Sequence, residues 1–210
     1  MKRVCFLGAS TVEGLGDEGG LGWPGRLALL SRGAKQPIVA YNLGVHGQTL
    51  KQIAARALAE CKPRLAPPVE GFVVLGTGAN DLACVGGIPR TPRRRLLADF
   101  AALLEALSAV APLLVIGPFP ICEARMPYLA AESGLRFEFS NADIMAVTAD
   151  YRKIAAEREV PFLDLFQRLL KDPRYLPALA KGDGLHGDGA AYQTVADLVF
   201  AWPAWQRAVA

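Results

Sequence analysis

The first ten residues constrain the fold of this chain more than any other stretch. Residues Val4 to Leu7 form an unbroken apolar run, and Gly8 then interrupts it. Four apolar residues without alternation are typical of a strand buried on both faces, as in a parallel sheet covered by helices. Because a glycine lets the backbone turn sharply, Ser10 is expected just beyond the carboxyl edge of that sheet.

A serine at this position has two possible roles. Serine commonly caps the N-terminus of a helix, and it acts as a nucleophile where a general base lies nearby. The first strand does not separate these roles, so a functional interpretation of Ser10 needs partners elsewhere in the chain.

Other apolar runs alternate with helical patterns along the whole chain. Further strands are predicted at residues 36–43, 71–75, 113–116 and 160–163, and helices at about 24–30, 50–61, 92–107, 142–158 and 189–202. Thr91 is expected to cap the third of these helices, with Pro92 at its first position. Strands that alternate with helices favour an α/β fold with a parallel sheet covered on both sides.

Composition limits the class of protein. The chain has 210 residues, 52% hydrophobic and 20% charged, and no linker, so one domain over residues 1–210 is expected. The balance of 23 basic against 20 acidic residues is too even to indicate a nucleic-acid surface. No apolar run approaches the ~20 residues needed to span a bilayer, and the run before Gly8 is too short for a signal peptide. The four cysteines form no close pair, so a cytoplasmic location is expected by default.

The chain has only two histidines, His46 and His186. His186 follows Asp183 by three residues in a loop bounded by glycines, a spacing that lets the carboxylate bind one ring nitrogen and leaves the other for a nucleophile. The alternative is that Asp183 or Asp188 caps a helix and that His186 has no catalytic role.

None of the five serines lies in a Gly-x-Ser-x-Gly turn, which argues against the common α/β-hydrolase arrangement. Ser10 is the only one predicted at the carboxyl end of a strand. The ends of the next two strands supply the Gly44 N–H and the Asn80 carboxamide, which together with the Ser10 N–H are able to form an oxyanion hole. The alternative for each is a structural role, Gly44 as a turn glycine and Asn80 as a turn-forming residue.

Three other features have less direct interpretations. Gly14-x-Gly16-x-x-Gly19 matches a dinucleotide fingerprint, but Asp17 and Glu18 would repel a pyrophosphate, so a surface loop is expected and nucleotide binding is the alternative. Four arginines, at positions 90, 93, 94 and 95, begin a helix and indicate either an anionic partner or a solvated face. Residues 119–141 have poor periodicity, which is typical of a functional loop such as a lid or of a mobile segment.

Four blocks taken together resemble the SGNH hydrolases, also called GDSL lipases and esterases. The blocks are Gly8-Ala9-Ser10, residues 42–49 (NLGVHGQT), Gly78-Ala79-Asn80-Asp81 and Asp183-Gly184-Leu185-His186. Each block alone is a weak signal, but their order and spacing match over nearly the whole chain.

This resemblance implies a flavodoxin-like, three-layer α/β/α sandwich around a five-stranded parallel sheet. It also implies Ser10 as nucleophile, His186 as base and then acid, Asp183 as its orienting partner, and Gly44 and Asn80 as oxyanion donors, with no metal or organic cofactor. The family's usual aspartate before the serine is Ala9 here, and that change affects the support of the loop more than the chemistry.

The expected function is a serine ester hydrolase of the lipase, esterase or lysophospholipase-like type, acting on a small-molecule ester rather than on nucleic acid. Carbohydrate O-deacetylation and thioester cleavage are alternatives within the family, and a catalytically silent binding protein is a further alternative because of Ala9. The substrate is expected near Val45, His46 and Leu82. Whether residues 119–141 form a lid over it is not predicted. The oligomeric state is not predicted.

Overall fold

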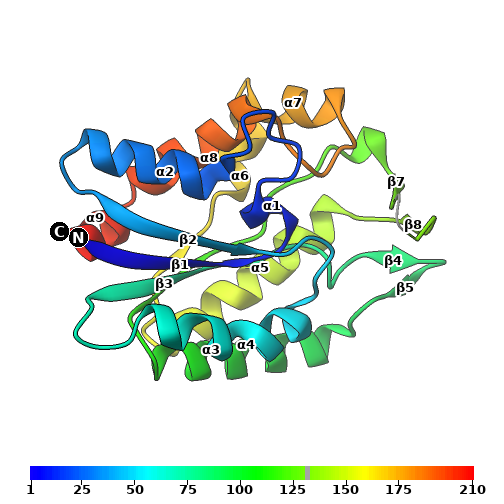
Figure 1. The fold of residues 1–210 in the computed structure, drawn as a ribbon. Coiled ribbons are helices and arrows are strands. Elements are labelled where there is room, and N and C mark those ends of the chain that lie inside the picture. Colours follow the sequence, from blue (N-terminus) through cyan, green and yellow to red (C-terminus); the bar gives the residue numbers. More distant parts are fainter. Residues whose placement is uncertain (131–132) are drawn as a thin grey trace.

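A five-stranded parallel sheet forms the centre of the molecule in the computed structural model, which describes residues 1–130 and 133–210 (Figure 1). Its strands lie in the order β2-β1-β3-β6-β9, the order of flavodoxin-like folds. Their bounds are β1 Lys2–Gly8, β2 Ile38–Gly44, β3 Gly71–Gly76, β6 Leu113–Ile116 and β9 Phe162–Leu163. The predicted α/β fold with a five-stranded parallel sheet is therefore confirmed.

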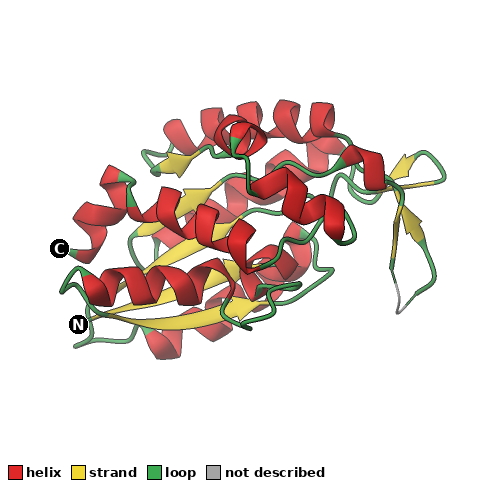
Figure 2. Cartoon of the chain, turned by 90° about the horizontal axis from the view of Figure 1, so that it is seen from above, coloured by secondary structure: helices red, strands yellow, loops and turns green. Residues whose placement is uncertain are grey.

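Helices cover both faces of the sheet, which gives three layers (Figures 1 and 2). One face carries α3 Leu50–Arg64, α4 Arg93–Ser108 and α5 Asn141–Ala156. The other carries α2 Gly22–Gly33, α6 Phe166–Lys171, α7 Tyr175–Lys181, α8 Gly189–Phe200 and α9 Pro203–Val209. A single turn, α1 Ser10–Glu13, follows β1 directly.

Two short hairpins extend past the carboxyl ends of the strands (Figure 1). They are formed by β4 Cys84–Val85 with β5 Ile88–Pro89, and by β7 Tyr128–Leu129 with β8 Arg136–Phe137. An antiparallel bridge between Cys84 and Glu138 joins the hairpins. The segment 119–141 is thus not an irregular loop: it holds the second hairpin and a 3-10 turn at Glu123–Arg125, and its residues 131 and 132 lie outside the described part.

Two helix boundaries differ from the sequence-based predictions. Thr91 does not cap α4, because its hydroxyl donates to Asp81 Oδ1 at 2.7 Å, and the helix begins two residues later at Arg93. The closing helix is divided: α8 ends at Phe200, and Pro203, whose nitrogen cannot donate to the preceding turn, begins α9. The short helices α6 and α7 were not predicted.

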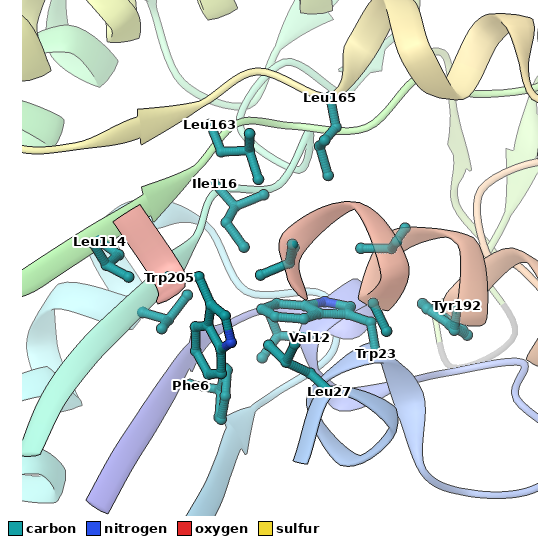
Figure 3. Close-up of a cluster of buried hydrophobic side chains, with 14 of the residues drawn as sticks. Phe6, Val12, Trp23, Leu27, Leu114, Ile116, Leu163, Leu165, Tyr192 and Trp205 are labelled. Atoms are coloured by element: carbon teal, nitrogen blue, oxygen red, sulfur yellow. The ribbon is translucent and has the colours of Figure 1, made fainter. Parts of the chain in front are cut away.

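Alternate residues of β1 are buried on opposite faces of the sheet. Val4 and Phe6 belong to the cluster beneath α2, α8 and α9, whereas Cys5 and Leu7 belong to the cluster beneath α3, α4 and α5. Figure 3 shows Phe6 beside two indole rings of the first cluster. The Phe6 ring lies 5.4 Å from Trp23, edge to face, and 6.2 Å from Trp205. This two-sided burial explains why the first strand has no polar alternation.

Replacing Trp23 with alanine is expected to lower the free energy of unfolding by about 3–5 kcal/mol, because the indole is fully buried and leaves a cavity. Trp23→Phe should cost less, since it keeps an aromatic ring and removes an indole N–H that has no partner in the described structure. Urea denaturation measures both values. Met145→Ala, at a side chain 50% exposed, is the control. An equal loss of stability in that variant would contradict the role given to burial of Trp23.

Candidate active site

The two ends of the chain meet above the carboxyl edge of the sheet. The Ser10 hydroxyl lies 2.8 Å from His186 Nε2, although the two residues are 176 positions apart in sequence. On the other side of the ring, His186 Nδ1 lies 2.7 Å from Asp183 Oδ2. Ser10 and His186 are both buried. These three side chains form one continuous chain of hydrogen bonds, with the imidazole at its centre.

The turn after β1 frees the serine hydroxyl for this contact. Ala9, not Ser10, occupies the N-cap position of α1, and no side chain caps that helix. The alternative of Ser10 as a helix cap is therefore wrong. Gly8 is needed for packing, because a Cβ there would lie 2.3 Å from Val12 Cγ2. The strand and the α1 turn consequently hold the Ser10 side chain toward His186.

The loop that carries His186 is organised by Asp183. Its Oδ1 accepts the N–H groups of Leu185 and His186 at 2.8 and 2.9 Å, which leaves Oδ2 for the imidazole. The helix-capping role belongs to Asp188, whose side chain accepts the first free N–H groups of α8. Asp183 therefore orients the histidine and does not cap α8.

The environment of Asp183 favours its ionised form. Burial of the carboxyl group opposes ionisation, but the hydrogen bond and charge of His186, together with the two backbone N–H donors, outweigh burial and lower its pKa below the ordinary value. A carboxylate that stays ionised fixes one tautomer of the ring and stabilises the imidazolium when His186 accepts a proton.

The lowered pKa predicts a pH-dependent contribution of Asp183 to stability. The folded state favours the ionised carboxylate, so this stabilisation is fully present above the unfolded pKa of about 3.9 and is lost as pH falls through the lower folded-state pKa. The difference in free energy of unfolding between wild type and Asp183→Asn should therefore stay constant from neutral pH down to about 4 and shrink below it. Urea denaturation across a pH series measures it, and a difference that stays constant over the whole series would contradict this account.

A cavity of about 230 Å³ opens beside the Ser10 hydroxyl. Ser10, His186, Asn80 and His46 line it, whereas the predicted contacts Val45 and Leu82 are not among the described lining residues. Leu82 instead packs partly buried between two hydrophobic clusters. Much of the wall is apolar and comes from the segment after β6 and from the loop of His186: Phe119, Pro120, Ile121, Tyr128, Phe137, Phe139 and Leu185.

The structure does not bring Gly44 to this cavity. Its N–H donates to Asn42 Oδ1 at 3.0 Å, and a Cβ at this position would lie 2.1 Å from the backbone nitrogen of Glu13. Gly44 is therefore a glycine because α1 passes directly against β2. The prediction of Gly44 as an oxyanion donor does not fit this geometry.

Gly47, which the sequence reasoning missed, lies in the cavity wall with Asn80 and Ser10. The segment 42–49 contains two glycines, and sequence alone gives no reason to prefer the second. Gly47 has a φ of 71°, a conformation that favours glycine. It lies three residues beyond the end of β2, at the carboxyl edge of the sheet.

Arg56 connects the serine turn to the loop beside Asn80. Its guanidinium donates to the Gly8 carbonyl at 2.9 Å and to Gln48 Oε1 at 2.7 Å. The Asn80 side chain in turn donates to the Gln48 carbonyl at 2.9 Å. These bonds link the two parts of the site around Ala9, which is itself buried in the hydrophobic cluster beneath α3 and α4.

The glycine-rich loop after α1 has a structural role. The Asp17 carboxylate accepts the N–H groups of Gly19 and Gly22 and pairs with Arg26 at 2.8 Å. A carboxylate thus occupies the donors that a phosphate would need, in agreement with the predicted surface loop. Among the described residues, no group of three or more His, Cys, Asp or Glu side chains is arranged to hold a metal ion. No described helix combines the length and the apolar character that crossing a bilayer requires.

Comparison with known proteins agrees with this architecture. The model of the GDSL-like Lipase/Acylhydrolase family matches residues 6–194. A lipase/acylhydrolase from Enterococcus faecalis superposes with a TM-score of 0.74 at 17% identity, covering 95% of this chain and 94% of that one. A catalytic mutant of an acetylxylan esterase from Geobacillus stearothermophilus gives 0.68 at 16% identity over 99% and 94%. A GDSL-like lipase from Bacteroides thetaiotaomicron gives 0.62 at 20% identity over 99% and 87%. No curated protein matches the sequence.

Proposed function

The chain belongs to the GDSL-like lipase/acylhydrolase family and is a carboxylic ester hydrolase, and we propose that Ser10, His186 and Asp183 are its catalytic triad. The observation that carries this proposal is the pair of short contacts on the two nitrogens of His186, 2.8 Å to the serine and 2.7 Å to the aspartate. A nucleophile, a base and an orienting carboxylate in this order are the requirements for acyl transfer.

The proposed reaction has two steps. In the first, His186 takes the hydroxyl proton while Ser10 Oγ bonds to the ester carbonyl carbon, and the imidazolium then protonates the alcohol as its bond to that carbon breaks. In the second, His186 removes a proton from water while the water oxygen bonds to the carbonyl carbon of the acyl-serine. The bond from that carbon to Ser10 Oγ then breaks, His186 returns the proton to Ser10, and the carboxylic acid is released. The enzyme ends in its starting state.

The negative charge that develops on the carbonyl oxygen needs hydrogen-bond donors that point at this oxygen. The proposal assigns this role to the N–H groups of Ser10 and Gly47 and to the Asn80 carboxamide, with Gly47 in place of Gly44. Gly47 and Asn80 both line the cavity beside Ser10, and Asn80 is held there by its bond to the Gln48 carbonyl. Donors fixed before the reaction stabilise the oxyanion without reorganisation.

The cavity wall supports an ester with an apolar acyl or aromatic part. Aromatic and aliphatic side chains dominate the lining, whereas the hydroxyl-rich substrate of a carbohydrate O-deacetylase needs more hydrogen-bonding side chains. A thioester would react by the same route. The four cysteines are free thiols, which supports a reducing compartment such as the cytoplasm.

Ser10→Ala is expected to abolish hydrolysis of 4-nitrophenyl esters and covalent labelling by a fluorophosphonate probe, since both reactions need the serine oxygen. Spectrophotometric rates on esters from acetate to long acyl chains, with gel detection of the probe, measure the two effects. Ser108→Ala, at an exposed position at the end of α4, is the matched control. Wild-type protein that neither turns over nor is labelled would support the silent binding protein instead.

Asn80→Ala should lower kcat on the order of a hundredfold, or by about 3 kcal/mol in the barrier, because one oxyanion donor is lost. The value of KM should change much less, since the donor acts mainly on the transition state. Steady-state kinetics on 4-nitrophenyl acetate and a thermal melt of the variant give the two readouts. A folded variant with the wild-type kcat would remove Asn80 from the oxyanion hole.

A further inference from the structure

The four arginines around the start of α4 have different surroundings. Arg93 pairs with Asp150 of α5 at 2.7 Å, and Arg95 pairs with Asp99 one turn along its own helix at 2.8 Å. Arg94 is exposed and is not among the residues that line the cavity. Arg90 alone of the four lines the cavity beside the triad.

The backbone at Arg90 is anchored close to the proposed oxyanion donors. Its N–H donates to the Ala83 carbonyl at 2.9 Å, which closes the β4–β5 hairpin. The next residue, Thr91, is held by the backbone and side chain of Asp81, which directly follows Asn80. The same Asp81 carboxylate accepts the N–H of Leu50 at the start of α3. The backbone of Arg90 is therefore held in a fixed position relative to Asn80.

Two contacts hold the Arg90 side chain along the wall of the cavity. One Nη donates to the Gly47 carbonyl at 3.1 Å, and the guanidinium lies 5.6 Å from the centre of the Phe137 ring. No carboxylate of residues 1–130 and 133–210 forms an ion pair with it. A guanidinium has five N–H donors, so donors remain for a further acceptor.

The surroundings of Arg90 make an anion a good ligand. Among the described lining residues there is no Asp or Glu, and the wall opposite is largely apolar. A guanidinium at the edge of an apolar cavity binds a carboxylate by charge-assisted hydrogen bonds that are stronger than those between neutral groups. Arg90 is itself exposed, so the anion would be bound at the mouth of the cavity.

We propose that Arg90 forms an anion subsite of the active site, so that the preferred substrates are esters carrying a carboxylate within a few bonds of the scissile group. This inference rests on the proposed function, because it names a substrate class for the same cavity. Arg90 contacts the Gly47 carbonyl and therefore lies beside the residue whose N–H is proposed as an oxyanion donor. The subsite selects the substrate and takes no part in proton transfer.

Matched pairs of esters test the subsite. The carboxylate lies on the alcohol side in 4-acetoxybenzoate, whose neutral partner is its methyl ester, and on the acyl side in mono-4-nitrophenyl adipate, whose neutral partner is methyl 4-nitrophenyl adipate. The measured quantity is the ratio of kcat/KM for the anionic ester to that for its neutral partner. An Arg90 variant that disturbs the backbone at Gly47 lowers the activity on both esters of a pair, and such a loss cancels in the ratio.

In Arg90→Gln this ratio should fall at least tenfold on one of the two arms, mainly through KM, and the arm that responds identifies the side of the ester that carries the charge. Arg90→Lys should keep part of the preference, since it keeps the charge but loses the planar fork. Arg94→Gln is the matched control and should leave the ratio unchanged. An unchanged ratio for Arg90→Gln on both arms, or an equal fall in Arg94→Gln, would overturn the proposal.

A binding measurement separates this inference from the proposed reaction. Calorimetric titration of Ser10→Ala protein with the same esters needs no turnover, and adding Arg90→Gln should weaken binding of an anionic ester at least tenfold relative to its neutral partner. If wild type hydrolyses the neutral esters and Ser10→Ala does not, the proposed function stands whatever the Arg90 result. Equal binding of anionic and neutral esters by Ser10→Ala protein would overturn the subsite alone.

Discussion

The burial of β1 on both faces is the constraint on which the rest of the structure depends. Because Val4 and Phe6 pack toward one helical layer and Cys5 and Leu7 toward the other, the strand can lie only in the interior of a covered sheet. Its carboxyl end then opens at the edge where strand order reverses, which is where open α/β sheets bind ligands. Ser10 is positioned by this packing before any partner in the site contributes.

The site around that serine is organised by a few polar side chains, each with a separate task. Asp183 folds its own loop with one oxygen and binds His186 with the other, while Asp188 caps the next helix. Asn42 accepts the Gly44 N–H with its side-chain oxygen and donates from its side-chain nitrogen to the Val12 carbonyl of α1. Asn80, in contrast, lines the cavity. This division matters because a buried donor or acceptor without a partner costs more, about 1–3 kcal/mol, than a hydrogen bond contributes net, about 0.5–1.5 kcal/mol.

The cavity combines two kinds of wall that come from different parts of the chain. The strand ends supply the polar groups next to Ser10, and the hairpin region after β6 supplies most of the apolar surface, with the Tyr128 ring 5.9 Å from the His186 ring. The bridge between Cys84 and Glu138 ties the two hairpins together, so the apolar wall and the turn that carries Arg90 form one unit. The residues proposed for substrate selection and those proposed for the chemistry thus come largely from separate structural elements.

Sequence alone determined the sheet and its strands, and it singled out the three residues that we propose as the catalytic triad. Apolar runs ending in glycine mark buried parallel strands, and a protein with two histidines offers few choices of base. The proposal of Gly47 in place of Gly44 needed the tertiary structure, because it depends on α1 passing against β2, where a Gly44 Cβ would lie 2.1 Å from the Glu13 nitrogen. It also decided that Thr91 binds Asp81 instead of capping α4, and that Arg90 differs from its three neighbours. These outcomes depend on which distant segments come into contact, and local periodicity carries no information about that.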